Sequence, residues 1–460
     1  MAQKINPQGA VPQENKMGTM PIGKLLAAMA IPMMISMLVQ ALYNVVDSVF
    51  VARISENALN AVSLAFPLQN LMIAVGAGTG VGLNALLSRS LGEKKQGNVD
   101  RAANVGLFLA LCSALVFALL GIFGSRFFFL AQTDVPEIVE GGTTYAIICL
   151  GLSVGLFFQF CFERLLQSTG RTMLSMLTQL VGAVINIILD PILIFGLLGA
   201  PKLGVAGAAW ATVFGQIVAA VLGLVLNVKY NHELHLRLRE VRFHRETVAE
   251  IYRIGLPSII MQSIGSVMTF GLNKILISFT TTATAVFGAY FKLQSFIFMP
   301  VFGLNNGMIP IIAYNYGAAR LDRVKRTINL TIGTATAIMC VGFLLFQFVP
   351  GMLLRLFDAS PEMLTIGVPA LRIISYSFLL AGFCIIATSV CQAIGNPLHS
   401  LVVAVCRQLL VLMPAAYLLS LTGQLNLVWL AFPIAELVSL ALSVLFLRRT
   451  LRMVETRLTP

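Results

Sequence analysis

Three polar side chains share one face of a long apolar stretch near the start of the chain. Residues 31–53 are apolar over more than twenty positions, enough to cross a bilayer core as a helix. Gln40, Tyr43 and Asp47 follow at spacings of three and four, which puts them on the same side of that helix. An ionised carboxylate in hydrocarbon costs roughly 3 kcal/mol. Asp47 therefore either has a function or is held in a buried hydrogen bond between helices.

A second acid lies in a similar setting further along the chain. The segment NIILDPIL, residues 186–193, places Asn186 and Asp190 on one helix face, with Pro191 directly after. If Asp47 and Asp190 belong to the first and fifth crossings, their helices run in the same direction and hold the acids at similar depth. Two carboxylates in a low-dielectric pocket do not ionise together easily, so the pair should bind a proton or a Na⁺ ion. The simpler alternative is a static hydrogen bond with one shared proton.

The composition indicates the class of protein that carries these acids. The chain has 460 residues, of which 58% are hydrophobic and only 11% charged, whereas soluble domains carry about 25% charged residues. The segments are long and apolar rather than short and alternating, which favours membrane helices over a membrane β-barrel. All seven cysteines fall inside apolar segments without a CxxC pair, so we expect them to be packing residues. Residues 1–20 are polar, and we expect no cleavable signal peptide.

Twelve apolar segments divide the chain, and their lengths fit one helical crossing each. They span residues 25–52, 58–84, 102–126, 138–162, 171–198, 204–228, 251–279, 284–312, 326–349, 364–391, 398–420 and 426–447. We therefore predict an all-α polytopic membrane protein. Its expected parts are a cytoplasmic tail (1–24), an N-lobe of six helices (25–228), a cytoplasmic linker (229–250), a C-lobe of six helices (251–447) and a cytoplasmic tail (448–460).

The basic residues predict the orientation. Most of the 31 Lys and Arg residues lie in the two tails and in the joints that follow even-numbered segments. Only Arg53, Arg126, Lys202 and Arg355 lie in the alternate joints. By the positive-inside rule both termini are cytoplasmic. The same distribution accounts for the net charge of +12 without a nucleic-acid partner.

The two halves of the chain repeat each other at an offset of 225 residues. Identities recur at this offset without a gap, among them Gly78 with Gly303, Gly82 with Gly307, Gly92 with Gly317, Gln69 with Gln294 and Gln167 with Gln392. Because each half has an even number of segments, both halves enter the membrane from the same side. The two six-helix bundles should therefore be parallel repeats, related by a pseudo-two-fold axis along the membrane normal, with substrate bound between them.

The repeat serves as an internal control for function. At the offset of 225, Asp47 corresponds to Leu272, Asn186 to Val411 and Asp190 to Ala415, so the acids belong to the first half only. Gln69 and Gln294 are matched, and they either line the cleft or support helix packing. The second half has its own unmatched charges, with Lys292, Arg407 and Glu436 as secondary candidates for the site and Lys274 and Arg372 beside them. Some of these should snorkel, and Glu436 should pair with one of the bases.

The motifs resemble those of a known family. The segments YNVVDSVFVARI, NIILDPILIFG, GVAGAAWAT and YNYGA, within twelve helices in two repeated halves, resemble the multidrug and toxic compound extrusion (MATE) family from about Pro32 to Arg448. The pattern is similar to the bacterial branch whose acids lie in the N-lobe. This resemblance implies a cation site at Asp47, Asn186 and Asp190, with Gln40 and Tyr43 near the drug site. Another branch carries acids on helices 7 and 10, whose apolar spans contain no Asp or Glu here.

These observations predict a transporter rather than an enzyme. We expect an antiporter in the bacterial inner membrane that exports amphipathic, cationic organic compounds in exchange for H⁺ or Na⁺, without a cofactor or resident metal. Its partners should be small organic substrates and membrane lipids, and the protein should be a monomer. A flippase for lipids or lipid-linked oligosaccharides is the main alternative, and it requires a strongly basic cleft. An ion channel would need a pore lined by both repeats, which the one-sided acids contradict.

Overall fold

The structure, a computed structural model, describes residues 14–357 and 359–458, and it is helical over these ranges apart from short joints. Eight single helices are long and apolar enough to span a membrane. They are α2 (Ile22–Ala52), α3 (Glu56–Gly92), α4 (Gln96–Leu130), α7 (Thr172–Phe195), α8 (Val205–Tyr230), α9 (Arg245–Ile277), α10 (Thr281–Gly317) and α11 (Leu321–Phe348).

The remaining crossings are built from consecutive helices. Helices α15 (Pro397–Val405), η3 (Cys406–Leu412) and α16 (Met413–Ser420) form one span, and α17 (Leu425–Val428) with α18 (Ala431–Leu458) forms another. Two more are bent pairs, α5 (Pro136–Gly151) with α6 (Val154–Ser168) at 43°, and α13 (Pro361–Ser375) with α14 (Phe378–Ile394) at 49°. Counting each pair as one span gives the twelve predicted crossings. The short elements α1 (Lys16–Thr19), η1 (Leu197–Gly199), η2 (Leu238–Glu240) and α12 (Pro350–Arg355) lie between or before them.

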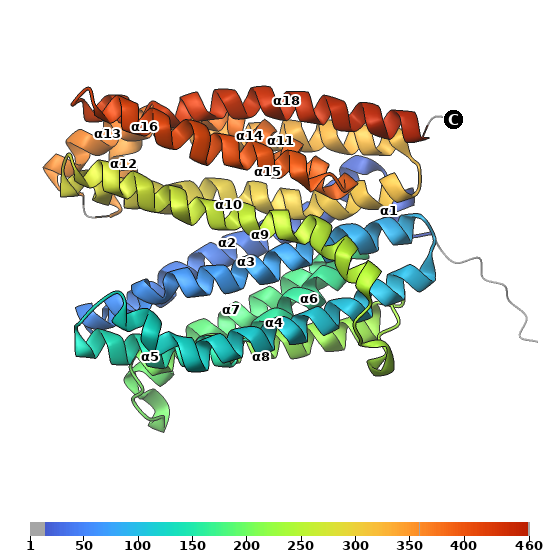
Figure 1. The fold of residues 1–460 in the computed structure, drawn as a ribbon, viewed down its shortest axis with the longest axis horizontal. Helices are drawn as coiled ribbons and strands as arrows, with labels where there is room; N and C mark the ends of the chain where they lie inside the picture. Colours follow the sequence, from blue (N-terminus) through green and yellow to red (C-terminus); the bar gives the residue numbers. More distant parts are fainter. Residues whose placement is uncertain (1–13, 358, 459–460) are drawn as a thin grey trace, which may run out of the picture.

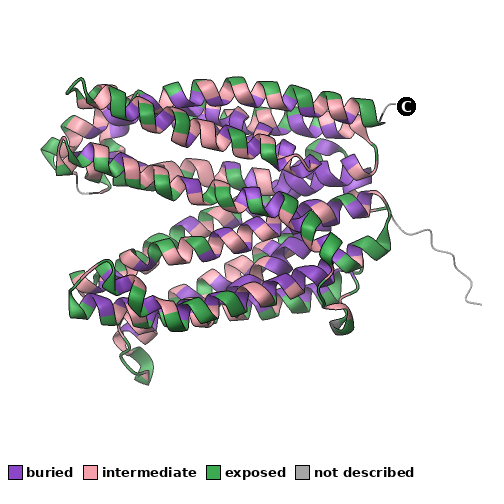
Figure 2. Ribbon diagram, in the orientation of Figure 1, coloured by how far each residue is buried: buried purple, intermediate pink, exposed green. Residues whose placement is uncertain are grey.

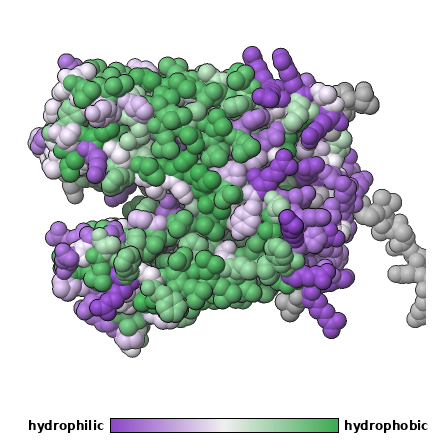
Figure 3. Space-filling model, in the orientation of Figure 1, coloured by the Kyte–Doolittle hydropathy of each residue, from purple (hydrophilic) through white to green (hydrophobic). Residues whose placement is uncertain are grey.

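The helices form two bundles that meet at one end and separate at the other (Figure 1). Helices α2–α8 make one bundle, the N-lobe, and α9–α18 make the second, the C-lobe. We call the end that carries α1 and the C-terminus the closed end, and the opposite end the open end. Hydrophilic residues gather at the closed end, an apolar belt crosses the middle, and a hollow separates the lobes at the open end (Figure 3).

Each lobe has its own apolar core, but at the closed end one helix of each lobe packs into the core of the other. The first turns of α2, including Leu25 and Met29, pack in the core of the C-lobe. In the same way Ile251, near the start of α9, belongs to the core of the N-lobe. Buried residues are accordingly dense where the lobes meet (Figure 2). The two bundles therefore share one interior at the closed end.

Glycines that recur in the repeat make this contact possible. A Cβ on Gly307 would lie 2.7 Å from Cα of Ala30, and one on Gly82 would collide with the backbone carbonyl of Ile251. Gly92 and Gly317 likewise have no room for a Cβ against the backbone of the other lobe. The matched glycines thus form the seam along which the two lobes touch. The backbones approach so closely there that none of these positions has room for a side chain.

The repeat extends to local conformation, with one departure. Lys94 and Ala319, which are 225 residues apart, both have a φ of 57° in equivalent turns. Within the fifth crossing of the C-lobe, however, η3 is a π-helix, which accommodates an extra residue. Gly182, Asn186 and Asp190 are buried in α7. The buried positions within and after the π-helix lie 226 residues on, at Gln408, Leu412 and Ala416.

The predicted counterparts Val411 and Ala415 are therefore off by one residue. The π-helix sits between apolar residues, so the hydropathy pattern carries no sign of it. The conclusion that the C-lobe lacks these acids holds in the corrected register, since Leu412 and Ala416 are apolar.

The closed end is completed by the N-terminal segment, residues 14–20. On the N-lobe side the amide of Asn15 donates to the Thr169 carbonyl at 3.0 Å and to the Glu233 carboxylate at 2.8 Å. Burial raises the pKa of the Glu233 carboxyl, and the bond from Asn15 opposes that rise.

The C-lobe holds the same segment by its backbone carbonyls. The amide of Asn315 donates to the Met17 carbonyl at 3.0 Å. Arg323 donates to the carbonyls of Met17 at 2.9 Å and Met20 at 2.7 Å. The segment therefore bridges both lobes, and Met17 is fully buried between them.

Candidate functional site

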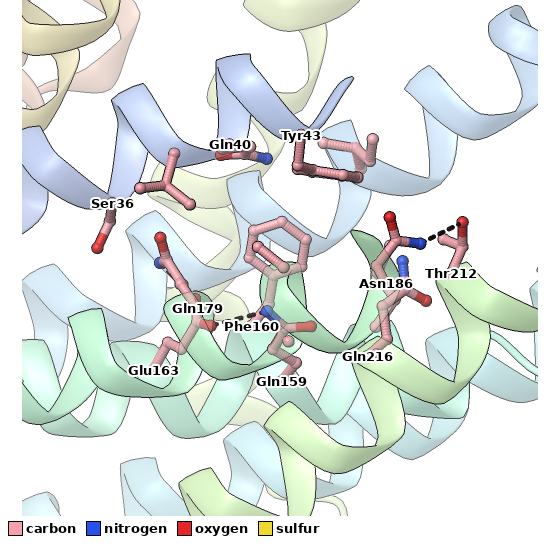
Figure 4. A pocket seen from close by; sticks show the side chains of 16 residues that line it. Ser36, Gln40, Tyr43, Gln159, Phe160, Glu163, Gln179, Asn186, Thr212 and Gln216 are labelled. Carbon is pink, nitrogen blue, oxygen red and sulfur yellow. Dashed lines mark hydrogen bonds between the residues drawn. The ribbon is translucent and has the colours of Figure 1, made fainter. Parts of the chain in front are cut away.

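The N-lobe contains a partly open cavity of about 100 Å³ between α2, α3, α6, α7 and α8 (Figure 4). Its polar lining is rich in carboxamides. The polar lining residues are Ser36, Gln40, Tyr43, Gln159, Glu163, Gln179, Asn186, Thr212 and Gln216. Val39, Ile73, Leu156 and Phe160 supply apolar surface. The cavity thus offers apolar contact together with many hydrogen-bonding groups, a combination suited to amphipathic molecules.

Glu163 is the acid in the wall of this cavity. It is only 3% exposed, and its carboxylate accepts hydrogen bonds from Gln159 at 2.9 Å, Gln179 at 2.8 Å and Thr178 at 3.3 Å. These donors come from α6 and α7, so the carboxylate ties two helices of the cavity wall together. When it is ionised, a carboxylate held by these donors places negative charge in a low-dielectric site, which attracts a cation.

The two predicted acids lie together just beyond the cavity. The carboxyl groups of Asp47 on α2 and Asp190 on α7 are in hydrogen-bonding contact with each other. Asp190 is fully buried, and one oxygen of each acid has no other partner among the described residues. Tyr43, which lines the cavity, is near enough to interact electrostatically with both acids. The pair therefore forms a compact site for a proton or a small cation beside the cavity.

Asn186 and Thr212 connect this pair to the cavity wall. The Asn186 amide contacts the Thr212 hydroxyl at 3.2 Å. Both groups are satisfied when the amide nitrogen donates to Asp190 Oδ2 at 3.2 Å and the amide oxygen accepts from the Thr212 backbone nitrogen at 3.1 Å. Pro191 has no N–H, so the carbonyl of Ile187 loses its helical partner close to Asp190. Carboxylate, amide and hydroxyl oxygens suit Na⁺ as well as H⁺.

The structure brings together five of the predicted site residues and separates the others. Gln40, Tyr43 and Asn186 line the cavity, and Asp47 and Asp190 adjoin it. The other predicted residues lie outside the lining.

Gln69 donates to the Tyr145 hydroxyl at 2.9 Å within the N-lobe. Tyr145 is in turn close enough to Asp47 to interact with its charge. Gln294 and Lys292 lie on α10 in the C-lobe, where Lys292 sits over the ring of Phe357. Arg407 and Glu436 form an ion pair inside the C-lobe at 3.4 Å, so the predicted pairing of Glu436 with a base is confirmed.

Two charged residues of the site, Glu163 and Arg164, were missed by the sequence reading. The predicted fourth segment ended at residue 162, which left both in the following polar joint. In the structure α6 continues to Ser168, and both side chains are buried. Comparison of the halves contains a signal, because residues 163 and 164 correspond at 225 to Thr388 and Ser389 and are therefore unmatched charges.

Arg164 extends from the cavity helix to the other lobe. Its guanidinium donates to Gln167 at 2.8 Å and to Asn306 on α10 at 3.3 Å. It is also close enough to Glu163 to interact with its charge. The neighbours Glu163 and Arg164 thus join the cavity wall to the seam between the lobes.

Within residues 14–357 and 359–458, no cluster of three or more His, Cys, Asp and Glu side chains is arranged to hold a metal ion. For a coupling ion we therefore consider the oxygen-rich site beside the cavity, which consists of the acid pair, Asn186 and Thr212.

Known proteins share both the sequence and the fold. The chain is 27% identical over 410 residues to the multidrug export protein MepA of Staphylococcus haemolyticus, covering 89% of each chain. It is 28% identical over 424 residues to the FAD transporter of Shewanella oneidensis, covering 91% of this chain and 92% of that protein.

A solved outward-facing MATE family transporter of the MOP superfamily superposes with a TM-score of 0.91 at 26% identity, covering 96% of this chain and 99% of that one. The MatE family model matches residues 32–192 and again residues 257–418, one match for each lobe. The chain therefore belongs to the MATE family of transporters and is an integral membrane protein.

Proposed function

We propose that this protein is a secondary active antiporter that exports amphipathic, cationic organic compounds in exchange for H⁺ or Na⁺ by alternating access. The observation that carries the proposal is the acid pair Asp47–Asp190 placed directly beside a cavity whose wall contains a buried carboxylate. The MepA relatives are named multidrug export proteins, which supports the same substrate class.

The cavity favours organic cations over anions. Glu163 supplies negative charge in a region shielded from water, and the Phe160 ring supplies a π-face for a cation. The amides of Gln40, Gln159 and Gln179 serve as adaptable donors and acceptors. A cavity of this kind tolerates varied substrates, because no single polar contact is obligatory.

Coupling follows from competition for negative charge. In the outward-open form the coupling ion enters from the open end and neutralises Asp47 and Asp190. Their interaction with a cationic substrate then weakens, and the α2 face that carries Tyr43 and Asp47 readjusts, so the substrate leaves outward. The ion drives this step only because it binds one state more tightly than the other.

Return to the inward-open form requires the seam to part. The glycine contacts and the N-terminal segment hold the closed end together, so both must release when the cavity opens to the other side. Arg164 links these events, since its neighbour lines the cavity while its guanidinium contacts Asn306 across the seam.

We further propose that the closed end is cytoplasmic and that the protein lies in a bacterial inner membrane as a monomer. The basic joints at that end support this orientation. The proposed division keeps the tails 1–24 and 448–460, the lobes 25–228 and 251–447, and the linker 229–250. Residues 1–13 and 459–460 of the tails lie outside the described residues. Single cysteines at Gln96 and Thr133 in a cysteine-free background should react from opposite sides, and labelling of Gln96 from outside would reverse the orientation.

The decisive experiment is efflux of a fluorescent organic cation from proteoliposomes under an imposed pH gradient or an imposed Na⁺ gradient, applied separately. We expect one gradient to drive export and the other to have little effect. Export that needs neither gradient would contradict antiport.

The flippase alternative would need a strongly basic cleft, and the described bases of the C-lobe do not gather into one. Lys274 lies over the Phe270 ring, Arg372 donates to the Gln347 carbonyl at 3.1 Å, and Arg407 pairs with Glu436. One relative is named an FAD transporter, and FAD is an anionic compound. In this chain Glu163 would repel such an anion from the N-lobe cavity.

A further inference from the structure

The repeat assigns a region of the C-lobe to the position of the N-lobe cavity, and different side chains lie there. Before the π-helix the offset of 225 places Gly265 opposite Gln40 and Cys384 opposite Gln159. Within it, the offset of 226 places Gln408 opposite Gly182. All three N-lobe residues line the cavity.

The sixth crossings align at a different offset. They begin at Val205 and Leu425, so the offset there is 220, because the preceding loop is shorter. This register places Glu436 opposite Gln216, which also lines the N-lobe cavity. Gln408, Cys384 and Glu436 therefore surround the position where the C-lobe would hold a ligand.

In the C-lobe this position is closed by side chains from the π-helix. A Cβ on Gly265 would lie 3.9 Å from Gln408 Oε1, so the Gln408 side chain reaches across to α9. Arg407 reaches α18, where Nη1 lies 3.4 Å from Glu436 Oε2. Neither side chain has a polar counterpart in the N-lobe, where the same register gives Val181 and Gly182.

Glu436 has unused capacity to bind a cation. The residue is 5% exposed, and the Cys384 thiol and the Arg407 guanidinium contact its carboxylate. Oε1 is buried and has no partner among the described residues. The distance from Arg407 Nη1 to Glu436 Oε2 exceeds the usual length of a charge-assisted hydrogen bond, about 2.7–2.9 Å. A single guanidinium nitrogen therefore satisfies only part of the carboxylate.

We propose that the C-lobe holds a second site for a small organic cation, with Glu436 as its anion, and that the guanidinium of Arg407 occupies this site as a tethered ligand. Arg407 enters from the accessible side, with 29% of its side chain exposed against 7% for Glu436. A free guanidinium-class cation that reached Glu436 would not be held by a tether and could donate to both carboxylate oxygens in a two-point contact. Arg407 thus restricts cation binding in the native protein to the N-lobe.

This inference goes beyond the proposed transport function, because it concerns binding in the other lobe and requires no gradient. It is tested with methylguanidinium and the full-length protein in detergent. We expect millimolar methylguanidinium, at a hundredfold excess over Kd, to raise Tm of Arg407→Ala by about 3 °C beyond any rise in the wild-type protein, since a ligand that binds only the folded form stabilises it. Any binding in the N-lobe is common to both proteins, so the difference in the rise reports on the C-lobe site alone.

The matched control is Arg407→Ala combined with Glu436→Gln, which keeps the vacated space and removes the charge. The rise in Tm should be absent in this double variant. If Arg407→Ala does not purify as a folded protein, Arg407→Gln takes its place, with Arg407→Lys as the variant that keeps a tethered cation. A folded Arg407 variant without a rise, or an equal rise in the double variant, would overturn the proposal.

Discussion

The two lobes have the same helices in the same order, yet only one keeps a polar interior open. In the N-lobe a buried carboxylate, Glu163, is satisfied by neutral amides, and the space beside it stays free. In the C-lobe a buried carboxylate, Glu436, is satisfied by a cation of the chain itself. The difference teaches that duplication preserves the scaffold, while a few substitutions and one inserted residue decide which copy binds a ligand.

A second comparison concerns the residues that the lobes share. The matched glycines lie at the seam, where both lobes need close backbone approach. The unmatched acids Glu163 and Glu436 lie inside the lobes, where their roles differ. Matched positions therefore report on movement between the lobes, and unmatched positions report on binding.

The largest effect should come from the acid pair, which has no counterpart in the C-lobe. Asp47→Asn should reduce gradient-driven export to the rate of vesicles without protein, because an amide resembles a carboxyl that never releases its proton. Asp190→Asn should be nearly as severe. The measurement is efflux from proteoliposomes at equal protein content, with Leu272→Met at the matched C-lobe position as a control that keeps its activity. Wild-type export by Asp47→Asn would move the coupling site elsewhere, with Glu436 as the next candidate.

Next in size is the effect of a side chain in the seam. Gly82→Val or Gly307→Val should push the lobes apart at the closed end, since overpacking costs about 1–3 kcal/mol and would shift the two-state equilibrium about 5- to 150-fold. Export should fall, and a cysteine placed in the seam should become accessible from the closed end. The control is Gly333→Val, at a glycine with open space around its Cβ position. Equal accessibility in seam and control variants would show that the seam does not govern opening.

The charge of Glu163 should have a smaller, measurable effect on substrate affinity. Glu163→Gln is expected to weaken binding of a lipophilic cation about tenfold, because a charge-assisted contact of roughly 1.4 kcal/mol is lost. A lipophilic anion of similar size should bind the variant no worse than the wild type. Thr388→Val, at the equivalent C-lobe position, should leave both affinities unchanged. Tighter cation binding by Glu163→Gln would contradict a cationic substrate.

The pH dependence of binding shows whether the two acids of the pair attract the cation or only hold the helices together. Cation affinity should fall as pH falls from 8 to 5.5, because carboxylates that take up protons no longer attract the cation. The dependence should be reduced in Asp47→Asn combined with Asp190→Asn, and it should be lost when Glu163→Gln is added. Equilibrium binding of a fluorescent cation across this range measures it, and affinity that rises at low pH would favour the flippase alternative.

The smallest effect concerns the N-terminal segment at the closed end. Arg323→Ala removes the bonds to the carbonyls of Met17 and Met20, and it should raise accessibility at the closed end with only a modest change in export. Arg326→Ala, on an exposed position of the same helix, removes the same charge without those bonds and serves as the control. Identical accessibility in both variants would mean that the segment does not hold the lobes together.

Hydropathy and the internal repeat were enough to predict most of the architecture. The twelve crossings are long apolar runs, and membrane helices need such runs whatever their neighbours are. Asp47 and Asp190 could be found because an acid in an apolar run stands out locally.

There is a physical reason why the sequence analysis did not predict Glu163 and Arg164 as site residues. They sit near the end of an apolar run, where charged residues usually mark the boundary, and the partners that make burial tolerable come from other helices. Gln179 and Asn306 supply these contacts, and neither is near in sequence. The π-helix escaped because one additional apolar residue leaves the hydropathy pattern unchanged.

The N-terminal segment has a consequence for the order in which the molecule is assembled. Met17 is among the first described residues to leave the ribosome, but its partners Asn315 and Arg323 follow 298 and 306 residues later. The segment must therefore wait until most of both lobes has been inserted before its seat exists. Contacts between such distant parts of a chain form late, because the intervening loop must first be ordered. Docking of this segment is then a late step of biogenesis, and a fluorophore placed on it would distinguish a transporter with joined lobes from a chain that has inserted its helices without joining them.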